Sequence, residues 1–442
     1  MSLPPATMTD LPRTWRSTPD VLPKGIMPLK KLPKGDRWTV LDLFSGAGGF
    51  SFGFHAHPGF RVVGAIDVEV GKPSTGHGAI GCNETYAANM QLQPMPLDIA
   101  TLAPRDLRKA LAGVEVDVVI AGPPCTGFSR TVPENHLKDD PRNGLVRKTA
   151  DLVVALQPQV LVLENARELL CGKFTNHFEA LRSVLTRGGY RVVAETHMLT
   201  RFGLPQVRER AVVVAVRSGL EPRTLEDLWD GFSLRNEATS VRRAIGHLPP
   251  VAAGQPHTSD PLHVSTRVLE PLARQRLRAI PHDGGSWRAL YEDPKLRHLL
   301  IPSMLRAAQR GRFNHHCDVY GRMSWDRPAP TIKRECAHIG NGRYAHPEQD
   351  RLCTVREMAT LQGFPSSYKF IATSRKNMYR HIGDAVPPLV SHQVAWTVAW
   401  TLTGRRPLME DVILPGTHLT PTDLRQIECR DPLFARSSSV VG

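Results

Sequence analysis

Apolar runs alternate with segments of helical periodicity over the first half of the chain. Short runs that are apolar almost throughout are typical of strands buried on both faces of a sheet. Such runs are Thr39–Phe44, Phe60–Ile66, Val118–Ala121, Val160–Leu163 and Ala211–Val216, and Val146–Leu156 repeats apolar residues at helical spacing. Because strand and helix alternate through Val216, the pattern predicts an α/β fold whose mostly parallel sheet is covered by helices on both faces.

The pattern changes in the second half of the chain. Residues 227–327 interrupt the alternation. Thr354–Leu361 reads as a helix that Pro365 ends, and Leu389–Leu402 reads as a helix that should pack back against the first half of the sheet. We therefore expect a discontinuous sheet domain with a smaller inserted domain. The expected divisions are a flexible basic extension at 1–36, the sheet domain at 37–235 and 328–420, the insert at 236–327, and a tail at 421–442.

The composition adds a class of partner to this picture. The chain has 442 residues, 41% hydrophobic and 22% charged, which suits a globular protein with a sizeable core. Its net charge of +14 predicts a polyanionic partner. Seven cysteines without regular spacing favour a reducing compartment. The sequence has no apolar run long enough to span a bilayer and no signal pattern, so we expect a cytoplasmic protein without a membrane segment. We also expect a monomer.

A glycine-rich turn follows the first predicted strand. Phe44 and Ser45 lead into Gly46, Gly48 and Gly49, where the backbone can turn tightly and approach a ligand. Such a turn alone is a weak indication of a nucleotide site. Acidic residues in the positions of Asp67 and Asp98 could accept hydrogen bonds from ribose and adenine, although either alone is more often a solvated strand end. The three features together favour an adenosine-containing cofactor.

A cysteine stands directly after the third predicted strand. Gly-Pro-Pro stops that strand and places Cys125 on a stiff turn, where its thiol is a candidate nucleophile. A lone cysteine is more often a small buried hydrophobe. The next strand ends in Glu164 and Asn165, so these residues are expected beside Cys125 at the carboxyl edge of the sheet. Further on, two arginines spaced by one residue, at 208 and 210, should share one side of an extended segment, as an anion clamp or as a surface charge pair.

The ordered set of these strings resembles the DNA (cytosine-5) methyltransferases. The strings are DLFSGAGGF, GPPCTGFS, ENA, QVRER, RECAHIGNGRYAHPEQDRLCTVREMATLQGFP and HIGDAVPP, and they extend from about Val40 to Thr401. The resemblance implies a Rossmann-like fold dependent on S-adenosylmethionine, with an inserted target-recognition domain. It also implies that a target cytosine is flipped out of duplex DNA and methylated at carbon 5.

The resemblance also assigns roles to individual residues. Cys125 would add to C6 of the base and Glu164 would bind N3. Arg208 and Arg210 would hold the base oxygen and nearby phosphate, while Pro124 and Asn165 would shape the pocket. The residues implied for the donor are Phe44, Ser45, Gly46, Gly48, Gly49, Asp67, Val68, Asp98, Ile99, Pro123, Asp384, Ala385 and Val386.

Basic residues point to the DNA-reading part of the chain. Arg274, Arg276 and Arg278 lie in the insert and are expected to contact DNA, together with Ser129 and Arg130. The alternative is a basic surface without sequence readout. Residues 130–143 are the expected closing loop. Residues 211–327 leave room for a DNA-reading domain, whereas the tRNA-directed cytosine methyltransferases have little sequence at this place. The length of this segment therefore favours duplex DNA over tRNA as the substrate. The presence of Cys125, Glu164 and Arg210 disfavours the alternative of a catalytically silent DNA-binding relative. A cognate restriction endonuclease is a candidate partner.

Other features complete the expectations. The residues His315, His316, Cys317, Cys336, His338 and Cys353 have no spacing typical of zinc knuckles, so we expect no metal. Asp67 stands where the family usually has Glu, and residues 71–81 form an extra glycine-rich segment. Asp384 stands where the family has Asn, near the methionine end of the donor, so we expect it to weaken donor binding.

Overall fold

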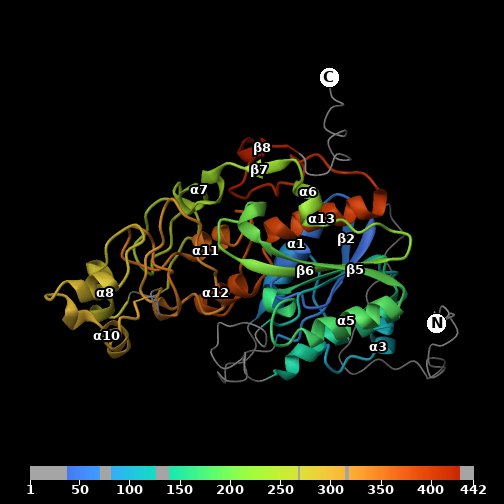
Figure 1. The fold of residues 1–442 in the computed structure, drawn as a ribbon, viewed down its shortest axis with the longest axis horizontal. Coiled ribbons are helices and arrows are strands. Elements are labelled where there is room, and N and C mark those ends of the chain that lie inside the picture. Colours follow the sequence, from blue (N-terminus) through green and yellow to red (C-terminus); the bar gives the residue numbers. More distant parts are fainter. Residues whose placement is uncertain (1–36, 70–80, 126–138, 267–268, 314–317, 429–442) are drawn as a thin grey trace.

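A six-stranded sheet forms the centre of the protein in a computed structural model (Figure 1). The structure describes residues 37–69, 81–125, 139–266, 269–313 and 318–428. The strands are β1 (Trp38–Asp42), β2 (Phe60–Ala65), β3 (Val118–Ala121), β4 (Val160–Ala166), β5 (Tyr190–Met198) and β6 (Glu209–Arg217). They lie in the order β2-β1-β3-β4-β6-β5. The first four pair in parallel, and β6 runs antiparallel to both β4 and β5, which confirms the predicted mostly parallel sheet.

Helices cover both faces of this sheet (Figure 1). On one face, α1 (Gly49–Ala56) packs against α13 (Pro388–Thr403), which α6 (Leu225–Trp229) also contacts. On the other face, α4 (Gly144–Leu156) packs against α3 (Pro104–Ala110) and α5 (Asn176–Arg187). Successive strand residues belong to different cores, as with Val118 and Val119. This two-sided burial explains why the strands are apolar at every position.

The last long helix joins the end of the chain to its beginning. Leu389, Val394 and Val398 on α13 lie in the same core as Phe50 and Phe54 on α1. Helix α13 extends from Pro388 to Thr403, where Leu389–Leu402 was predicted, and it packs on the first half of the sheet as expected. Residues more than 300 positions apart in the sequence therefore build one domain.

Some elements differ from the prediction at their ends. Strand β1 stops at Asp42, because the Asp42 carboxylate accepts a hydrogen bond from the Phe44 N–H (3.2 Å) and turns the chain. Helix α11 (Val355–Leu361) ends before Pro365, since Gly363 adopts a φ of 82° and stops the helix first. Strand β8 (Leu424–Gln426) lies in the predicted tail, yet it pairs antiparallel with β7 (Phe232–Leu234). The folded part therefore extends beyond residue 420.

A lobe projects from the sheet on the side of α7 and α12 (Figure 1). Its helices are α7 (Val241–Ile245), α8 (Pro271–Ala279), α9 (Arg288–Glu292) and α10 (Pro302–Gln309), with α12 (Arg375–Asp384) and α11 closer to the sheet. The far end has a small core of its own, made by Ile280, Trp287, Leu290, Leu299, Met304 and Ala308. A further core joins α7, α11 and α12 to Tyr86 on α2 (Cys82–Met90). The limits 236 and 327 for a recognition domain stay a prediction. No helix among the described residues is long and apolar enough to cross a membrane.

Candidate active site

The glycine-rich turn between β1 and α1 is held by hydrogen bonds to the Asp67 carboxylate. Gly48, at φ 93°, precedes the first residue of α1 in a conformation that side chains resist. The Asp67 carboxylate accepts hydrogen bonds from the N–H groups of Gly46 (2.8 Å) and Glu69 (2.7 Å). The hydroxyl oxygen Oγ of Ser45 is buried and has no hydrogen-bond partner among the residues the structure describes. An orphaned polar atom beside an open turn fits a polar ligand there.

The residues expected around an adenosine group lie at this same edge. Asp98 is exposed, and its side chain accepts a hydrogen bond from the Ala100 N–H (2.9 Å). Val68 is exposed, and Ile99 is buried. A Cβ atom added to Gly49 would lie 2.3 Å from the carbonyl oxygen of Val386, so the chain around residues 385–386 closes directly over the turn. The turn, the Ser45 hydroxyl and this closure together form an edge at which a polar ligand fits.

Sequence reasoning missed a buried acid beneath the turn. The Asp42 carboxylate accepts a hydrogen bond from Ser51 Oγ (2.7 Å), which in turn accepts one from Tyr86 OH (2.8 Å). Burial raises the pKa of Asp42 to about 7, against the lowering effect of its hydrogen bonds. The string DLFSGAGGF contained this residue, but no periodicity distinguishes a buried carboxylate from one at a solvated strand end.

Cys125 lies just beyond the carboxyl end of β3, beside the end of β4. The register pairs Ala121 with Leu163, so the structure brings Cys125 and Glu164 to one edge, as predicted. The Asn165 side chain donates a hydrogen bond to the carbonyl of Pro123 (3.0 Å) and accepts one from the Ala166 N–H (2.8 Å). Asn165 thereby holds the turn that carries Cys125. Pro124, half-buried, completes that turn.

The thiol lies in a field of opposed charges. Loss of hydration raises the pKa of Cys125, Arg210 and Arg208 lower it, and Glu164 and Asp384 raise it. Cys125 is partly exposed, yet enough protein surrounds the sulfur for desolvation to dominate. The residues that sequence reasoning grouped by strand position are therefore close enough to act on one thiol.

Glu164 and Arg210 form the central ion pair of this edge. Arg210 Nε lies 2.9 Å from Glu164 Oε1, and both side chains are 14% exposed. That oxygen has no well-directed hydrogen bond among the described residues, although the pair is close. The short distance makes this a charge contact, and its poor direction leaves the oxygen able to accept a hydrogen bond from a ligand.

Arg208 is buried and braces the site from below. Its guanidinium donates to the carbonyls of Ile332 (3.1 Å) and Ala385 (3.4 Å), while its Nε has no partner among the described residues. Burial, followed by the charge of Arg210, lowers the pKa of Arg208 to about 9, so the side chain stays cationic at neutral pH. Gln206 continues this buried hydrogen-bond network, because it donates to Gln362 Oε1 (2.7 Å) and accepts from the Ile332 N–H (2.9 Å).

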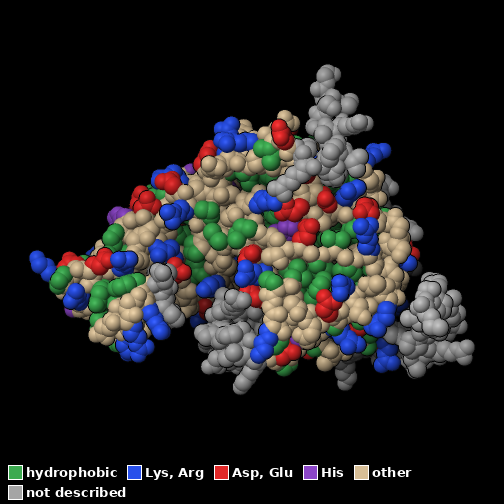
Figure 2. Space-filling view, viewed as in Figure 1, with side chains coloured by type: hydrophobic (Ala, Val, Ile, Leu, Met, Phe, Trp, Pro, Cys, Tyr) green, Lys and Arg blue, Asp and Glu red, His purple; other side chains and the backbone are tan. Residues whose placement is uncertain are grey.

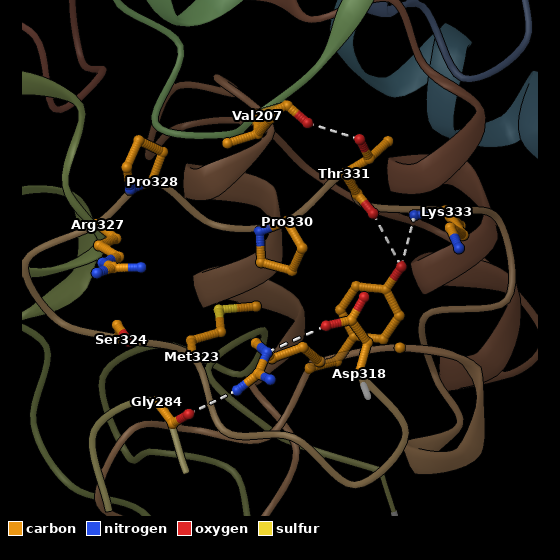
Figure 3. A pocket seen from close by; sticks show the side chains of 13 residues that line it. Val207, Gly284, Asp318, Met323, Ser324, Arg327, Pro328, Pro330, Thr331 and Lys333 are labelled. Atoms are coloured by element: carbon orange, nitrogen blue, oxygen red, sulfur yellow. Dashed lines mark hydrogen bonds and ion pairs between the residues drawn. The ribbon is translucent and has the colours of Figure 1, made fainter. Parts of the chain in front are cut away.

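A pocket of about 580 Å³ lies beside these residues, between the sheet domain and the lobe (Figure 3). Arg327 and Lys333 lie on opposite sides of it. Its other lining residues are Val207, Gly284, Asp318, Met323, Ser324, Pro328, Pro330, Thr331, Gly342, Arg343 and Tyr344. Arg343 is engaged within the protein, since it donates to the carbonyl of Gly284 (2.7 Å) and pairs with Asp318 (3.2 Å). The pocket therefore presents two exposed cations, Arg327 and Lys333, along a lining of mixed polarity.

One predicted DNA contact is corrected by the structure. Arg276 is buried, donates to the Tyr320 hydroxyl (2.8 Å) and lies over the Tyr320 ring, because its guanidinium completes the lobe's packing. Arg274 is half-buried, whereas Arg278 is exposed and pairs with Asp350 (3.4 Å). Ser129, Arg130 and most of the expected closing loop lie outside the described residues. Figure 2 shows Lys and Arg side chains around the lobe's end, where the exposed arginines are Arg278, Arg288, Arg297, Arg306, Arg310 and Arg312.

The cysteines and histidines of the lobe form no metal cluster within the described ranges. Cys336 and Cys353 are buried, and the Cys336 thiol donates to the carbonyl of Tyr379 (3.6 Å). His315, His316 and Cys317 lie outside the described residues.

The sheet order, the glycine-rich turn and the cysteine edge together define a Rossmann-like methyltransferase fold. Residues 38–400 match the family model described as C-5 cytosine-specific DNA methylase, and the chain belongs to that family. It is thus an enzyme, a DNA cytosine-5 methyltransferase.

Individual relatives span most of the chain. It is 28% identical to the Type II methylase M.HgiDII of Herpetosiphon aurantiacus, over 83% of this chain and 96% of that protein. It is 31% identical to the Type II methyltransferase M1.HphI of Haemophilus parahaemolyticus, over 81% and 86% respectively. The solved S. pombe Dnmt2 methyltransferase has the same fold, with a TM-score of 0.53 and 19% identity over 82% of this chain and 98% of that one.

Proposed function

We propose that this enzyme flips a cytosine out of duplex DNA and uses Cys125 to activate it for methylation at carbon 5. The observation that carries the proposal is the position of one thiol at the edge where Glu164, Arg208 and Arg210 converge. Flipping is needed because C5 and C6 of a stacked base are out of reach of these side chains, and it costs a few kcal/mol.

Cys125 supplies the nucleophile in this mechanism. The thiolate forms the Sγ–C6 bond, and the electron pair of the C5–C6 double bond moves toward C5 and N3. Glu164 lies at N3 and accepts a hydrogen bond from the proton that N3 takes up, which balances the density that arrives there. Arg210, paired with Glu164 at 2.9 Å, presents its remaining donors to the base oxygen. Once C5 has bonded the methyl group that the donor would supply and N3 has released its proton, loss of the C5 proton to water and cleavage of the Sγ–C6 bond would restore the double bond and release the thiolate.

The donor implied by the family is S-adenosylmethionine, which when bound supplies a methyl group on a positively charged sulfur. The residues that would hold it are those of the turn at 44–49, with Asp67, Asp98 and the segment 384–386. The Asp67 carboxylate already accepts hydrogen bonds from the N–H groups of Gly46 and Glu69. We therefore infer that it orients the turn as well as the ribose. The Ser45 hydroxyl, which has no partner within the described ranges, is a further candidate for the donor's polar end.

We place DNA across the pocket between the sheet domain and the lobe. Arg327 and Lys333 are suited to bind the phosphates that flank the flipped nucleotide. The exposed arginines of the lobe extend this basic surface. Arg276 is left out of this role because its guanidinium is occupied in the lobe's core.

Bisulfite sequencing tests the function in cells. DNA from cells that express the enzyme should carry 5-methylcytosine at a recurring sequence, and DNA from cells that express the Cys125→Ala variant at the same level should not. No methylated cytosine in DNA together with methylated cytosine in tRNA would favour the tRNA-directed alternative. No methylation in either would favour a silent DNA-binding relative.

A further inference from the structure

An apolar side chain is exposed at the rim of the pocket between the sheet domain and the lobe (Figure 3). Val207 is 46% exposed, whereas its neighbours Gln206 and Arg208 are buried. Successive side chains of an extended segment point to opposite sides, so the burial of Gln206 and Arg208 turns Val207 toward the pocket that it lines. Single exposed apolar residues are common on protein surfaces, so the meaning of Val207 depends on what surrounds it.

The backbone of Val207 is held in place by the segment 328–332. Its N–H donates to the carbonyl of Ala329 (2.8 Å), and its carbonyl accepts a hydrogen bond from the Thr331 hydroxyl (2.6 Å; Figure 3). The Ala329 N–H in turn donates to the carbonyl of Pro205 (3.0 Å). Val207 therefore cannot turn its side chain into the protein without breaking these hydrogen bonds.

Two prolines extend the apolar surface beside Val207. Pro328 and Pro330 are half-buried and line the same pocket, while Ala329 between them is buried. The pyrrolidine ring fixes φ in each proline, so this surface is stiff before any ligand binds. We call the surface formed by Val207, Pro328 and Pro330 the apolar ledge.

A cation stands at each end of the segment that carries the two prolines. Arg327 directly precedes Pro328, Lys333 follows Pro330 by three residues, and Figure 3 shows the two cations on opposite sides of the pocket. Both side chains are exposed. An apolar surface between cations suits a nucleotide chain, whose sugars and base faces are apolar and whose phosphates are anionic. The arrangement therefore favours a strand of nucleic acid over an apolar protein segment as the ligand of the ledge.

The apolar ledge lies beside the proposed catalytic residues and not among them. Val207 precedes Arg210 by three residues, about 10 Å along an extended chain, and Arg210 pairs with Glu164 (2.9 Å). The ledge is thus suited to contact the DNA next to the target cytosine. Flipping removes the stacking partner of that neighbouring nucleotide and uncovers its base face. An apolar side chain packed at such an opened base step offsets part of the cost of opening it.

We propose that Val207, supported by Pro328 and Pro330, packs against the nucleotide beside the flipped cytosine and thereby stabilises the flipped state. This proposal rests on the proposed function of the enzyme. Val207 contributes to the equilibrium between the stacked and the flipped base, and it takes no part in the bond-making steps.

The test compares the methylation of two duplexes that carry the sequence identified by bisulfite sequencing. The target cytosine is paired with guanine in one duplex and mismatched in the other, which lowers the cost of flipping. Single-turnover rates are measured at saturating enzyme and S-adenosylmethionine. Val207→Ala removes two methyl groups from the contact, so its rate on the paired duplex should fall about fivefold relative to the wild type. On the mismatched duplex, its rate should stay within about twofold of the wild-type rate on the same DNA.

Two further variants separate this role from a structural one. Val207→Ile keeps a β-branched apolar side chain and should retain the wild-type rate on both duplexes within about twofold. Leu408→Ala is the matched control, because Leu408 is 68% exposed and lies outside the pocket lining, and its rates should not change. Both backbone hydrogen bonds of Val207 remain possible in Val207→Ala, so its melting temperature should stay within about 2 °C of the wild type.

The pattern of losses decides the question. An unchanged rate of Val207→Ala on the paired duplex, an equal loss on both duplexes, or the same loss in Leu408→Ala would overturn the role of Val207. No methylation of either duplex by the wild-type enzyme would instead overturn the proposed function.

Discussion

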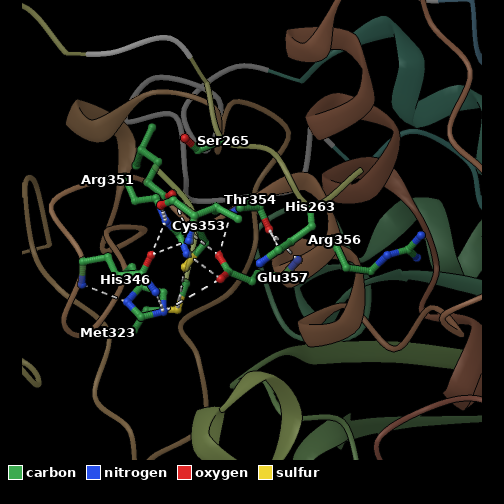
Figure 4. A network of polar contacts seen from close by, with 12 residues as sticks. His263, Ser265, Met323, His346, Arg351, Cys353, Thr354, Arg356 and Glu357 are labelled. Carbon is green, nitrogen blue, oxygen red and sulfur yellow. Dashed lines mark hydrogen bonds and ion pairs between the residues drawn. The ribbon is translucent and has the colours of Figure 1, made fainter. Parts of the chain in front are cut away.

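The buried Arg351–Glu357 pair should be a main support of the packing between the start of α11 and residues 251–263 (Figure 4). Two bonds of 2.7 and 2.8 Å join the guanidinium to the carboxylate, and the side chains are 2% and 1% exposed. Glu357 also accepts the N–H of Thr354 (2.7 Å), which caps α11, and the Thr354 hydroxyl lies 3.0 Å from His263 Nδ1. We predict that Glu357→Gln strongly destabilises the protein.

The structure gives the magnitude in two ways. Burial opposes the charge of Glu357, but its bonds to Arg351 prevail and lower its pKa from 4.5 to about 2. A shift of that size corresponds to about 3 kcal/mol of stability. Removing one partner of a buried ion pair costs about 3–5 kcal/mol, which agrees. Because the folded pKa is depressed, this stability is present above pH 4.5 and is lost as the pH falls through about 2.

Urea denaturation followed by tryptophan fluorescence measures the effect. With an m value of about 3 kcal/mol per M, the midpoint at pH 7 should fall by about 1 M in Glu357→Gln. Glu292→Gln is the control, since Glu292 forms an exposed pair with Arg288 (2.6 Å), and its midpoint should barely move. A loss under 1 kcal/mol, or acid destabilisation between pH 4.5 and 2 as steep as in the wild type, would refute the reasoning.

Other properties can be predicted from the same contacts. Because the pKa of Asp42 is raised, its contribution to stability is present below pH 3.8 and is lost as the pH rises through about 7. Thermal melts of Asp42→Asn should therefore lack that decline in melting temperature. A decline parallel to that of the wild type would contradict the assignment. Replacing Arg327 and Lys333 by Ala should lower the slope of log K for DNA against log salt by about 0.9 for each lost contact, and an unchanged slope would remove them from the interface. Arg276→Ala should instead lower the melting temperature and leave that slope unchanged. Asp384→Asn should tighten S-adenosylmethionine binding several-fold in calorimetry, because an amide can donate a hydrogen bond to the donor, whereas weaker binding would make Asp384 a ligand for its cationic part.

The sequence predicted the sheet and the convergence of Cys125 with Glu164 for a clear physical reason. Strands buried on both faces are apolar at every position, and parallel neighbours present their carboxyl ends at the same edge. The strand pairing of Ala121 with Leu163 follows from that pattern. The order of the motifs then identified the family without reference to distances.

Contacts between distant segments were beyond that reasoning. Arg334 and Asp384 were both within quoted strings, yet no periodicity links residues 50 positions apart. The three arginines of α8 look alike in sequence, but the fold turns Arg276 toward Tyr320 and leaves Arg278 in solvent. Strand β8 was missed because three residues are too few for a period, and its pairing with β7 is set by tertiary packing.

The most direct test of the central claim is covalent trapping by Cys125. Duplex DNA that contains 5-fluorocytosine should form a denaturation-resistant complex with the enzyme in the presence of S-adenosylmethionine, because the fluorine blocks the final elimination. Mass spectrometry of the digested complex should place the nucleotide on the peptide that contains Cys125, and Cys125→Ala should bind the DNA without forming the complex. A nucleotide attached to another residue, or a complex that forms equally well with Cys125→Ala, would contradict the account.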